Sequence, residues 1–131
     1  MTKHQAACSC GKLSLTAEGD PIRISICHCL ACQRRTGSAF GIQARFPREK
    51  VSVTGSAKEF VRVGDEGHRI TFRFCPECGA TVYYQFDEAP ETIAVPVGAF
   101  ADPTFPPPRV SVYGTRRHPW VCEPEGIEHF D

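Results

Sequence analysis

The sequence of 131 residues predicts a single, almost all-β domain whose strands fold over one another. Many of its apolar residues occur in short runs that alternate with polar residues or are rich in β-branched and aromatic side chains, and such runs are typical of strands. Clusters of Gly, Asp and Pro separate these runs and indicate turns. A chain of this length suits one hydrophobic core. No repeat, low-complexity tract or linker divides residues 1–131.

The predicted elements follow in chain order. KLSLTAE and KEFVRV alternate apolar and polar residues, and RITFRF, TVYYQF, TIAVPV and RVSVYG are rich in β-branched and aromatic residues. With FGIQARF as a further candidate, the strands are expected at 12–18, 40–46, 58–63, 69–74, 81–86, 92–97 and 109–114. Turns are expected at 19–21, 64–67 and 102–108, the last as a stiff, proline-rich surface loop. Only residues 30–35 favour a helical turn.

The charge balance and the cysteine count restrict the class of protein. Lys plus Arg and Asp plus Glu number 15 each, so the formal net charge is zero, which argues against a nucleic-acid or membrane-surface binder. We find no apolar run long enough for a signal peptide or a membrane span, and we expect a cytoplasmic protein. Thiols stay reduced in that compartment, so the eight cysteines indicate metal binding rather than disulfides.

Four cysteines predict a structural zinc site. Cys75 and Cys78 lie in CPECG, where two intervening residues let both sulfurs face one ion and Gly79 allows a tight turn. Cys8 and Cys10 are their expected partners, since one intervening residue on a strand puts both side chains on one face. Such a site would tie the N-terminal strand to the middle of the sheet. Rubredoxin-like iron, disulfides and buried free thiols are the less favoured alternatives.

The segment CHCLAC holds three further cysteines, Cys27, Cys29 and Cys32, and leaves two interpretations open. A second structural zinc would need a fourth ligand, such as His28, Cys122 or another side chain. A catalytic zinc would keep its fourth position for water or substrate. We expect His28 to point away, because it lies between two ligands on an extended segment. Cys122 is the stronger competitor, and spacing alone does not decide.

The combined motifs CSCGKLSL, CHCLACQRRTGSAFG, FCPECGATVYY and VPVGAFADP resemble the glutathione-dependent formaldehyde-activating enzyme family, which includes the domain of centromere protein V. The resemblance covers nearly the whole chain and implies a β-tent fold of two folded antiparallel sheets with two zinc ions. It implies a structural zinc on Cys8, Cys10, Cys75 and Cys78, and a catalytic zinc on Cys27, Cys29 and Cys32. Cys122 has no counterpart in that pattern.

The implied activity is that of a carbon–sulfur lyase, which joins glutathione and formaldehyde to S-hydroxymethylglutathione. Zinc with three thiolates is electron-rich and suits holding a further thiolate, such as that of glutathione or a similar thiol. The added negative charge requires compensation. Arg34 and Arg35 follow the cysteines directly, and we expect them to bind the thiol substrate by gripping one of its carboxylates.

Two other classes of function remain as alternatives. A non-catalytic zinc module would contact a protein or nucleic acid through Arg34, Arg35, Arg116 and Arg117. A redox or metal-buffering role would have the three-cysteine segment release its zinc on mild oxidation.

Overall fold

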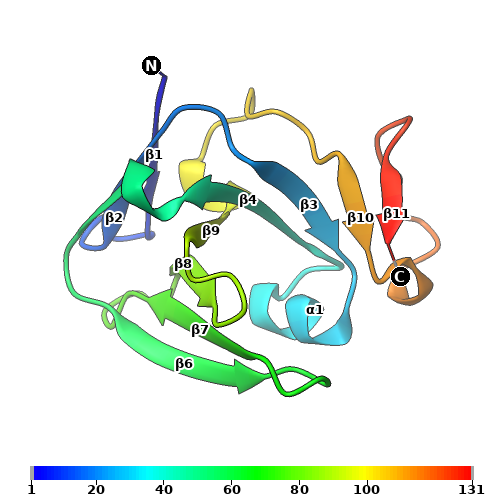
Figure 1. Cartoon of the computed structure of the whole chain (residues 1–131), viewed down its shortest axis with the longest axis horizontal. Coiled ribbons are helices and arrows are strands. Elements are labelled where there is room, and N and C mark those ends of the chain that lie inside the picture. Colours follow the sequence, from blue (N-terminus) through cyan, green and yellow to red (C-terminus); the bar gives the residue numbers. More distant parts are fainter. Residues whose placement is uncertain (1, 131) are drawn as a thin grey trace.

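The structure, a computed structural model, describes residues 2–130 and is mainly β, with two sheets and one α-helix, as predicted (Figure 1). The elements are β1 (Lys3–Ala7), β2 (Ser14–Glu18), β3 (Arg23–Cys27), α1 (Leu30–Thr36), β4 (Gly41–Pro47), η1 (Arg48–Lys50), β5 (Val51–Thr54), β6 (Lys58–Val63), β7 (Arg69–Phe74), β8 (Thr81–Phe86), β9 (Thr92–Pro96), η2 (Val97–Phe100), β10 (Val110–Val112), η3 (Gly114–Arg116) and β11 (Glu128–Phe130). No helix within residues 2–130 is long and apolar enough to cross a membrane.

The smaller sheet has the order β1-β2-β5, and the larger has the order β11-β10-β3-β4-β9-β8-β7-β6. All pairs are antiparallel except those of β10, which runs parallel to both β3 and β11. The expected antiparallel pattern therefore fails at one edge of the larger sheet. β10 reaches β3 from far along the chain, so no hairpin fixes its direction. The segment after β10 also lies beside the end of β3 (Figure 1).

The main core lies between the two sheets and follows the alternation of the strands. Leu15 and Ala17 of β2 are buried, as are Ala44 and Phe46 of β4. Val82, Ile93, Val95 and Phe100 belong to the same cluster and come from the larger sheet and η2. Each large apolar side chain buried here contributes about 1.5–3 kcal/mol to the stability of the fold.

The proline-rich segment after η2 runs over the surface, as expected, but one residue anchors it. Phe105 stacks on Phe100 with ring centroids 4.6 Å apart, and its ring also meets that of His4 at 5.5 Å. The segment is therefore fixed against the core before the chain enters β10.

The opposite face of the larger sheet carries polar and aromatic residues. On β3 the buried Ile24 alternates with Arg23 and Ser25, and Arg45 lies opposite Arg23 on β4. Phe72 and Tyr84 continue this face on β7 and β8, where they form a second, smaller buried cluster. α1 follows the end of β3 beside this face. The candidate functional site is built there.

Candidate metal centres and substrate pocket

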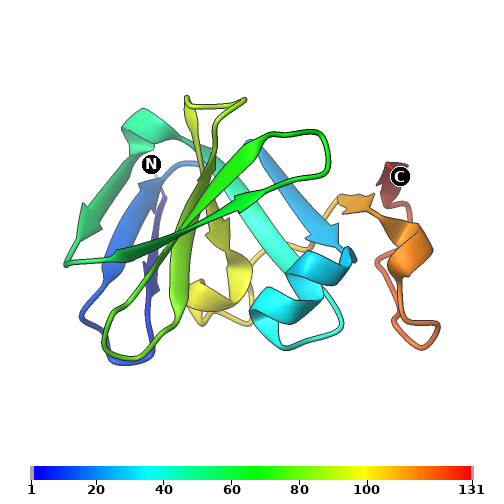
Figure 2. The same cartoon turned by 90° about the horizontal axis from the view of Figure 1, so that it is seen from below.

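The sulfur atoms of Cys8, Cys10, Cys75 and Cys78 all lie within 4.8 Å of one another. The Cys10 sulfur is 3.6 Å from that of Cys8 and 3.6 Å from that of Cys75. The first pair comes from the β1–β2 loop of the smaller sheet and the second from the β7–β8 loop of the larger sheet. Figure 2 shows these two loops side by side. The cluster thus joins the two sheets.

Both cysteine pairs lie in tight turns, and the expectation that Cys8 and Cys10 lie on a strand is wrong. β1 ends at Ala7, and the Gly11 N–H donates to the Cys8 carbonyl at 3.1 Å. The Gly79 N–H donates in the same way to the Cys75 carbonyl at 2.9 Å. Each glycine has a φ near +80°, a conformation that glycine adopts without a steric penalty. The turns, rather than strand alternation, therefore direct the sulfurs toward one point.

Backbone N–H groups stabilise negative charge on these sulfurs. The Leu13 N–H donates to Cys8 Sγ at 3.3 Å, and the Glu77 N–H donates to Cys75 Sγ at 3.4 Å. Hydrogen bonds from the backbone of Ala80 and Cys10 lower the pKa of Cys78 to about 6. Thiolates are the form that binds soft divalent metals, so this donor set fits such an ion.

The three-cysteine cluster occupies the junction of β3 and α1. Cys27 is the last residue of β3, Cys29 is the N-cap of α1, and Cys32 lies in its first turn. Their sulfurs lie within 4.8 Å of one another. The Cys32 N–H donates to Cys29 Sγ at 3.3 Å, so the helix N-terminus fixes one sulfur directly.

These three thiols do not ionise independently. Hydrogen bonds from the thiols of Cys27 and Cys32 lower the pKa of Cys29 to about 2. The same contact with Cys29, together with Cys32 and burial, raises the pKa of Cys27. One negative charge is accommodated without a counter-ion, and three adjacent thiolates require a cation. The donor set again fits a soft divalent metal.

Neither suggested fourth ligand belongs to this cluster. Within residues 2–130, the group of converging metal-type donors consists of the three cysteines alone. Cys122 is exposed. His28 points away, as expected, and its Nε2 lies 2.9 Å from Glu123 Oε2. The part of the chain that the structure describes therefore offers three cysteine sulfurs to this site and no fourth side chain.

The His28–Glu123 contact is buried and links the cluster to the C-terminal segment. The His28 side chain is fully buried, and that of Glu123 is 5% exposed. Burial raises the pKa of the Glu123 carboxyl, but the nearby Ser111 hydroxyl and the contact with His28 outweigh it, so this pKa lies below its usual value. Arg117 lies 3.3 Å from the other carboxylate oxygen. No local sequence pattern indicates this pair, whose members lie 95 residues apart.

Gln33 makes a second link between α1 and the C-terminal segment. Its amide nitrogen donates to the carbonyls of His28 at 2.9 Å and Arg116 at 3.2 Å. Its amide oxygen lies 2.9 Å from His118 Nε2. The cysteine-bearing segment is thus hydrogen-bonded to the C-terminal segment.

The three cysteines open into a pocket of about 600 Å³ on the polar face of the larger sheet. Aromatic rings of Phe72, Tyr84, Phe86 and Tyr113 line it. Its charged residues are five arginines and three acids, namely Arg23, Arg35, Arg45, Arg62, Arg116, Asp65, Glu66 and Glu88. Cationic groups outnumber anionic ones, so the pocket suits an anionic ligand.

The two arginines expected to bind substrate are separated in space. Arg35 lines the pocket, and its guanidinium carbon lies 4.9 Å from the Tyr84 ring centroid and 5.2 Å from that of Phe72. Arg34 is exposed and is not among the residues that line the pocket. Gly41 provides room for Arg35, because a Cβ at Gly41 would lie 3.1 Å from Arg35 Nη2.

Sequence reasoning missed Arg23, Arg45 and Arg62 as pocket residues. A signal for two of them was present in the predicted strands. Arg45 alternates with the apolar Ala44 and Phe46, so it had to face away from the core. Arg62 occupies a comparable place in KEFVRV. The sequence does not indicate which face of the sheet carries the pocket.

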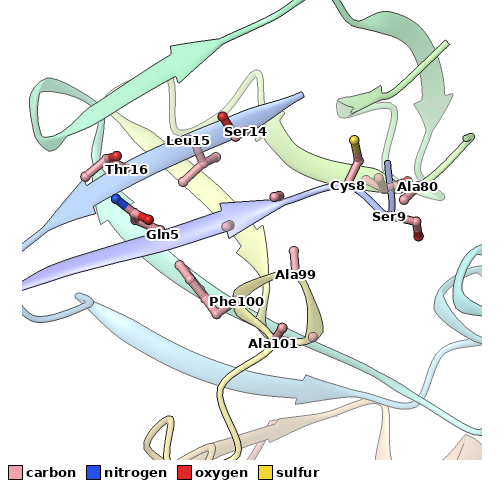
Figure 3. Close-up of a pocket in the computed structure, with 14 residues that line it drawn as sticks. Gln5, Cys8, Ser9, Ser14, Leu15, Thr16, Ala80, Ala99, Phe100 and Ala101 are labelled. Carbon is pink, nitrogen blue, oxygen red and sulfur yellow. The ribbon is translucent and has the colours of Figure 1, made fainter. Parts of the chain in front are cut away.

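A second pocket, of about 700 Å³, lies between β1, β2 and η2 (Figure 3). Small and uncharged residues such as Ala99, Ala101 and Ser14 line most of it. Its one thiol, Cys8, belongs to the four-cysteine cluster. This pocket therefore lacks the charged and nucleophilic groups found beside Cys27.

Comparisons with known proteins agree with this arrangement. A Rhodobacter sphaeroides protein of known crystal structure has a similar fold, with a TM-score of 0.58, 22% identity, and coverage of 79% of this chain and 91% of that one. A Fusarium vanettenii protein, provisionally named a glutathione-dependent formaldehyde-activating enzyme, is 29% identical over 97 residues. That match covers 67% of this chain and about half, 52%, of the relative. Residues 3–116 match the family described as glutathione-dependent formaldehyde-activating enzyme, and the chain belongs to this family.

Proposed function

We propose that the protein is a zinc-dependent carbon–sulfur lyase that joins and separates a thiol, glutathione or a similar one, and formaldehyde. The observation that carries the proposal is the three-cysteine cluster, which has no fourth side-chain ligand among the described residues and opens to a pocket rich in arginine. The family and the named relative support glutathione and formaldehyde as the reactants. All eight cysteines are free thiols, which supports a reducing compartment such as the cytoplasm.

We assign two zinc ions to the two clusters. Cys8, Cys10, Cys75 and Cys78 would hold one with four sulfurs, a closed set typical of structural zinc. Cys27, Cys29 and Cys32 would hold the other and leave a place for the substrate sulfur. When bound there, zinc lowers the pKa of an incoming thiol and keeps the thiolate nucleophilic.

The arginines nearest the three cysteines would offset the negative charge of the sulfurs. The electrostatic effect of Arg62 contributes to the low pKa of Cys29, and that of Arg35 favours the thiolate of Cys32. A further thiolate from the substrate adds one more negative charge. Arg35 is held over two aromatic rings, so its charge is positioned before the substrate arrives.

The reaction balances without an oxidant or reductant. A sulfur electron pair forms the bond to the formaldehyde carbon, and the C=O π pair moves to the oxygen. That oxygen takes up a proton equivalent to the one lost by the thiol. In reverse, the carbon–sulfur bond breaks and its electron pair returns to sulfur. The pocket holds the thiol for both directions.

The test is exchange NMR between formaldehyde and S-hydroxymethylglutathione with zinc-loaded protein. The adduct forms spontaneously, so the measured quantity is the exchange rate above a control without protein. We expect acceleration that disappears in Cys27→Ala. Cys122→Ser is the matched control, since this exposed cysteine lies outside both clusters, and it should retain the activity. Full activity in folded Cys27→Ala would overturn the mechanism.

A further inference from the structure

Two arginines lie directly opposite each other at the end of the pocket away from the cysteines. Arg23 of β3 pairs in register with Arg45 of β4, and both line the pocket. Arg23 and Cys27 are four residues apart on one strand, so they share a face. At about 3.3 Å per residue, their Cα atoms lie about 13 Å apart. Arg23 and Cys27 thus occupy the two ends of β3.

Neither guanidinium has an ionic partner among the residues that the structure describes. Within residues 2–130, no carboxylate lies within 4.0 Å of the side-chain nitrogens of Arg23 or Arg45. The buried Nε of Arg23 has no hydrogen-bond partner among those residues. Arg45 Nε donates to Gln43 Oε1 at 3.1 Å, which leaves its two terminal nitrogens for another acceptor. Two adjacent guanidinium groups with no carboxylate within ion-pair distance indicate a binding site for an anion.

The Arg45 side chain is held against an aromatic ring, in surroundings that disfavour its positive charge. The Arg45 guanidinium carbon lies 4.6 Å from the Phe86 ring centroid. Burial and the charge of Arg23 lower the pKa of Arg45. Glu88 lines the same pocket, but its Oε2 lies 3.3 Å from His68 Nε2 rather than beside an arginine. The charge of Glu88 offsets this repulsion only in part, and a bound anion would relieve the rest.

We propose that Arg23 and Arg45 bind a carboxylate of the thiol substrate, at the end of the substrate opposite its sulfur. This inference rests on the proposed function, in which the sulfur lies at the three cysteines. Planar guanidinium groups recognise a carboxylate through paired hydrogen bonds. The distance along β3 makes the pocket selective for extended thiols of tripeptide size with a terminal carboxylate. Short thiols without a carboxylate, such as cysteamine, would bind only through sulfur.

The first test measures binding without catalysis. S-methylglutathione keeps both carboxylates of glutathione but has no free thiol, and its affinity for the zinc-loaded protein can be measured by NMR titration. We expect Arg23→Gln and Arg45→Gln each to weaken binding by roughly tenfold or more. Arg45→Lys should lose less, since it keeps the charge without the fork. Arg48→Gln, an exposed arginine outside the pocket, is the matched control and should bind normally.

The second test uses the exchange assay with glutathione and with cysteamine. We expect the glutamine variants to raise KM for glutathione roughly tenfold, to leave kcat within about twofold, and to leave cysteamine kinetics unchanged. Equal losses for both thiols, or unchanged S-methylglutathione binding in folded variants, would overturn the inference. If the unaltered protein accelerates exchange of no thiol, the proposed function fails, while the binding test still decides the carboxylate site. Should one glutamine variant not fold, the other and Arg45→Lys provide the same decision.

Discussion

The two cysteine clusters differ in the length of chain that they connect. The four-cysteine cluster joins Cys10 to Cys75, 65 residues away, and links two sheets. The three-cysteine cluster lies within six residues, from Cys27 to Cys32, and therefore connects no distant parts of the chain. Closing a long loop removes more conformational entropy from the unfolded chain than closing a short one. A metal would therefore contribute chiefly to stability at the first cluster and chiefly to chemistry at the second.

The groups that surround the two cysteine clusters also differ in how freely they can move. Backbone N–H groups of tight turns face Cys8 and Cys75, and these groups cannot move without unfolding the turns. The other cluster faces a pocket with movable arginine side chains, such as Arg35 and Arg62. A closed shell of sulfurs and amides resists exchange of ligands, whereas an open one admits a substrate.

The largest effect is expected for Cys75→Ser, which removes a buried sulfur from the four-cysteine cluster. Metal binding at such a site is coupled to folding, so the melting temperature should fall by roughly 10–20 °C. Differential scanning calorimetry and metal analysis of the same samples would measure both quantities. A variant that loses its metal yet melts within 2 °C or so of the unaltered protein would contradict the structural role.

Cys29→Ala should separate activity from stability. The exchange activity should be lost, while the melting temperature should fall by no more than roughly 5 °C, because the cluster closes no long loop. Metal analysis should show the loss of one ion with the second retained. Loss of both ions together would show that the two clusters do not bind independently.

Glu123→Ala tests the contact behind the three cysteines. It leaves the buried His28 ring without its partner, which should cost about 1–3 kcal/mol in the free energy of unfolding. Chemical denaturation would measure this change. Glu123→Gln should lose less because it can still accept a hydrogen bond. The exposed Glu125→Ala is the control, and a loss in that variant as large as in Glu123→Ala would argue against a specific contact.

The smallest effect is expected in a pair of neighbours on α1. Arg35→Gln should lower the exchange rate roughly tenfold through loss of positive charge near the sulfurs, whereas Arg34→Gln should change it by less than about twofold. Steady-state exchange rates at matched zinc content would compare them. Equal losses in the two variants would mean that the pocket contributes only a general positive potential.

Much of the fold was predictable because strand alternation and β-branched residues are local signals. The bounds of β6, β7 and β8 match the expected runs, and β2, β4, β9 and β10 match in part. β1, β3, β5 and β11 were missed. KHQAA in β1 and EHF in β11 have few apolar residues, and RISIC in β3 merges with the cysteine motif. β1 and β11 therefore depend on their neighbours rather than on their own pattern, whereas RISIC in β3 and VSVT in β5 do alternate apolar and polar residues.

The grouping of the cysteines was readable from spacing, but the roles of the arginines were not. Arg35 follows Cys32 by three residues, so a helix puts both on one face, whereas Arg34 points elsewhere. The helical turn expected at residues 30–35 already indicates this separation, although both arginines were expected to bind the substrate. Arg23 and Arg45 become neighbours only through the pairing of β3 with β4, and Glu123 meets His28 across 95 residues. Such contacts have no local signal.

The His28–Glu123 contact also has a consequence for synthesis of the chain. Ribosomes add roughly 5–20 residues per second, so the 95 residues between the two partners take on the order of 5–20 s to translate. During that interval Cys27, Cys29 and Cys32 are already made, while the buried support behind them, including the β10 neighbour of β3, is still missing. The nascent three-thiol segment is thus open to metal ions and oxidants before its pocket exists. The order of events therefore allows a metal ion to reach these sulfurs before the last third of the chain has joined the sheet.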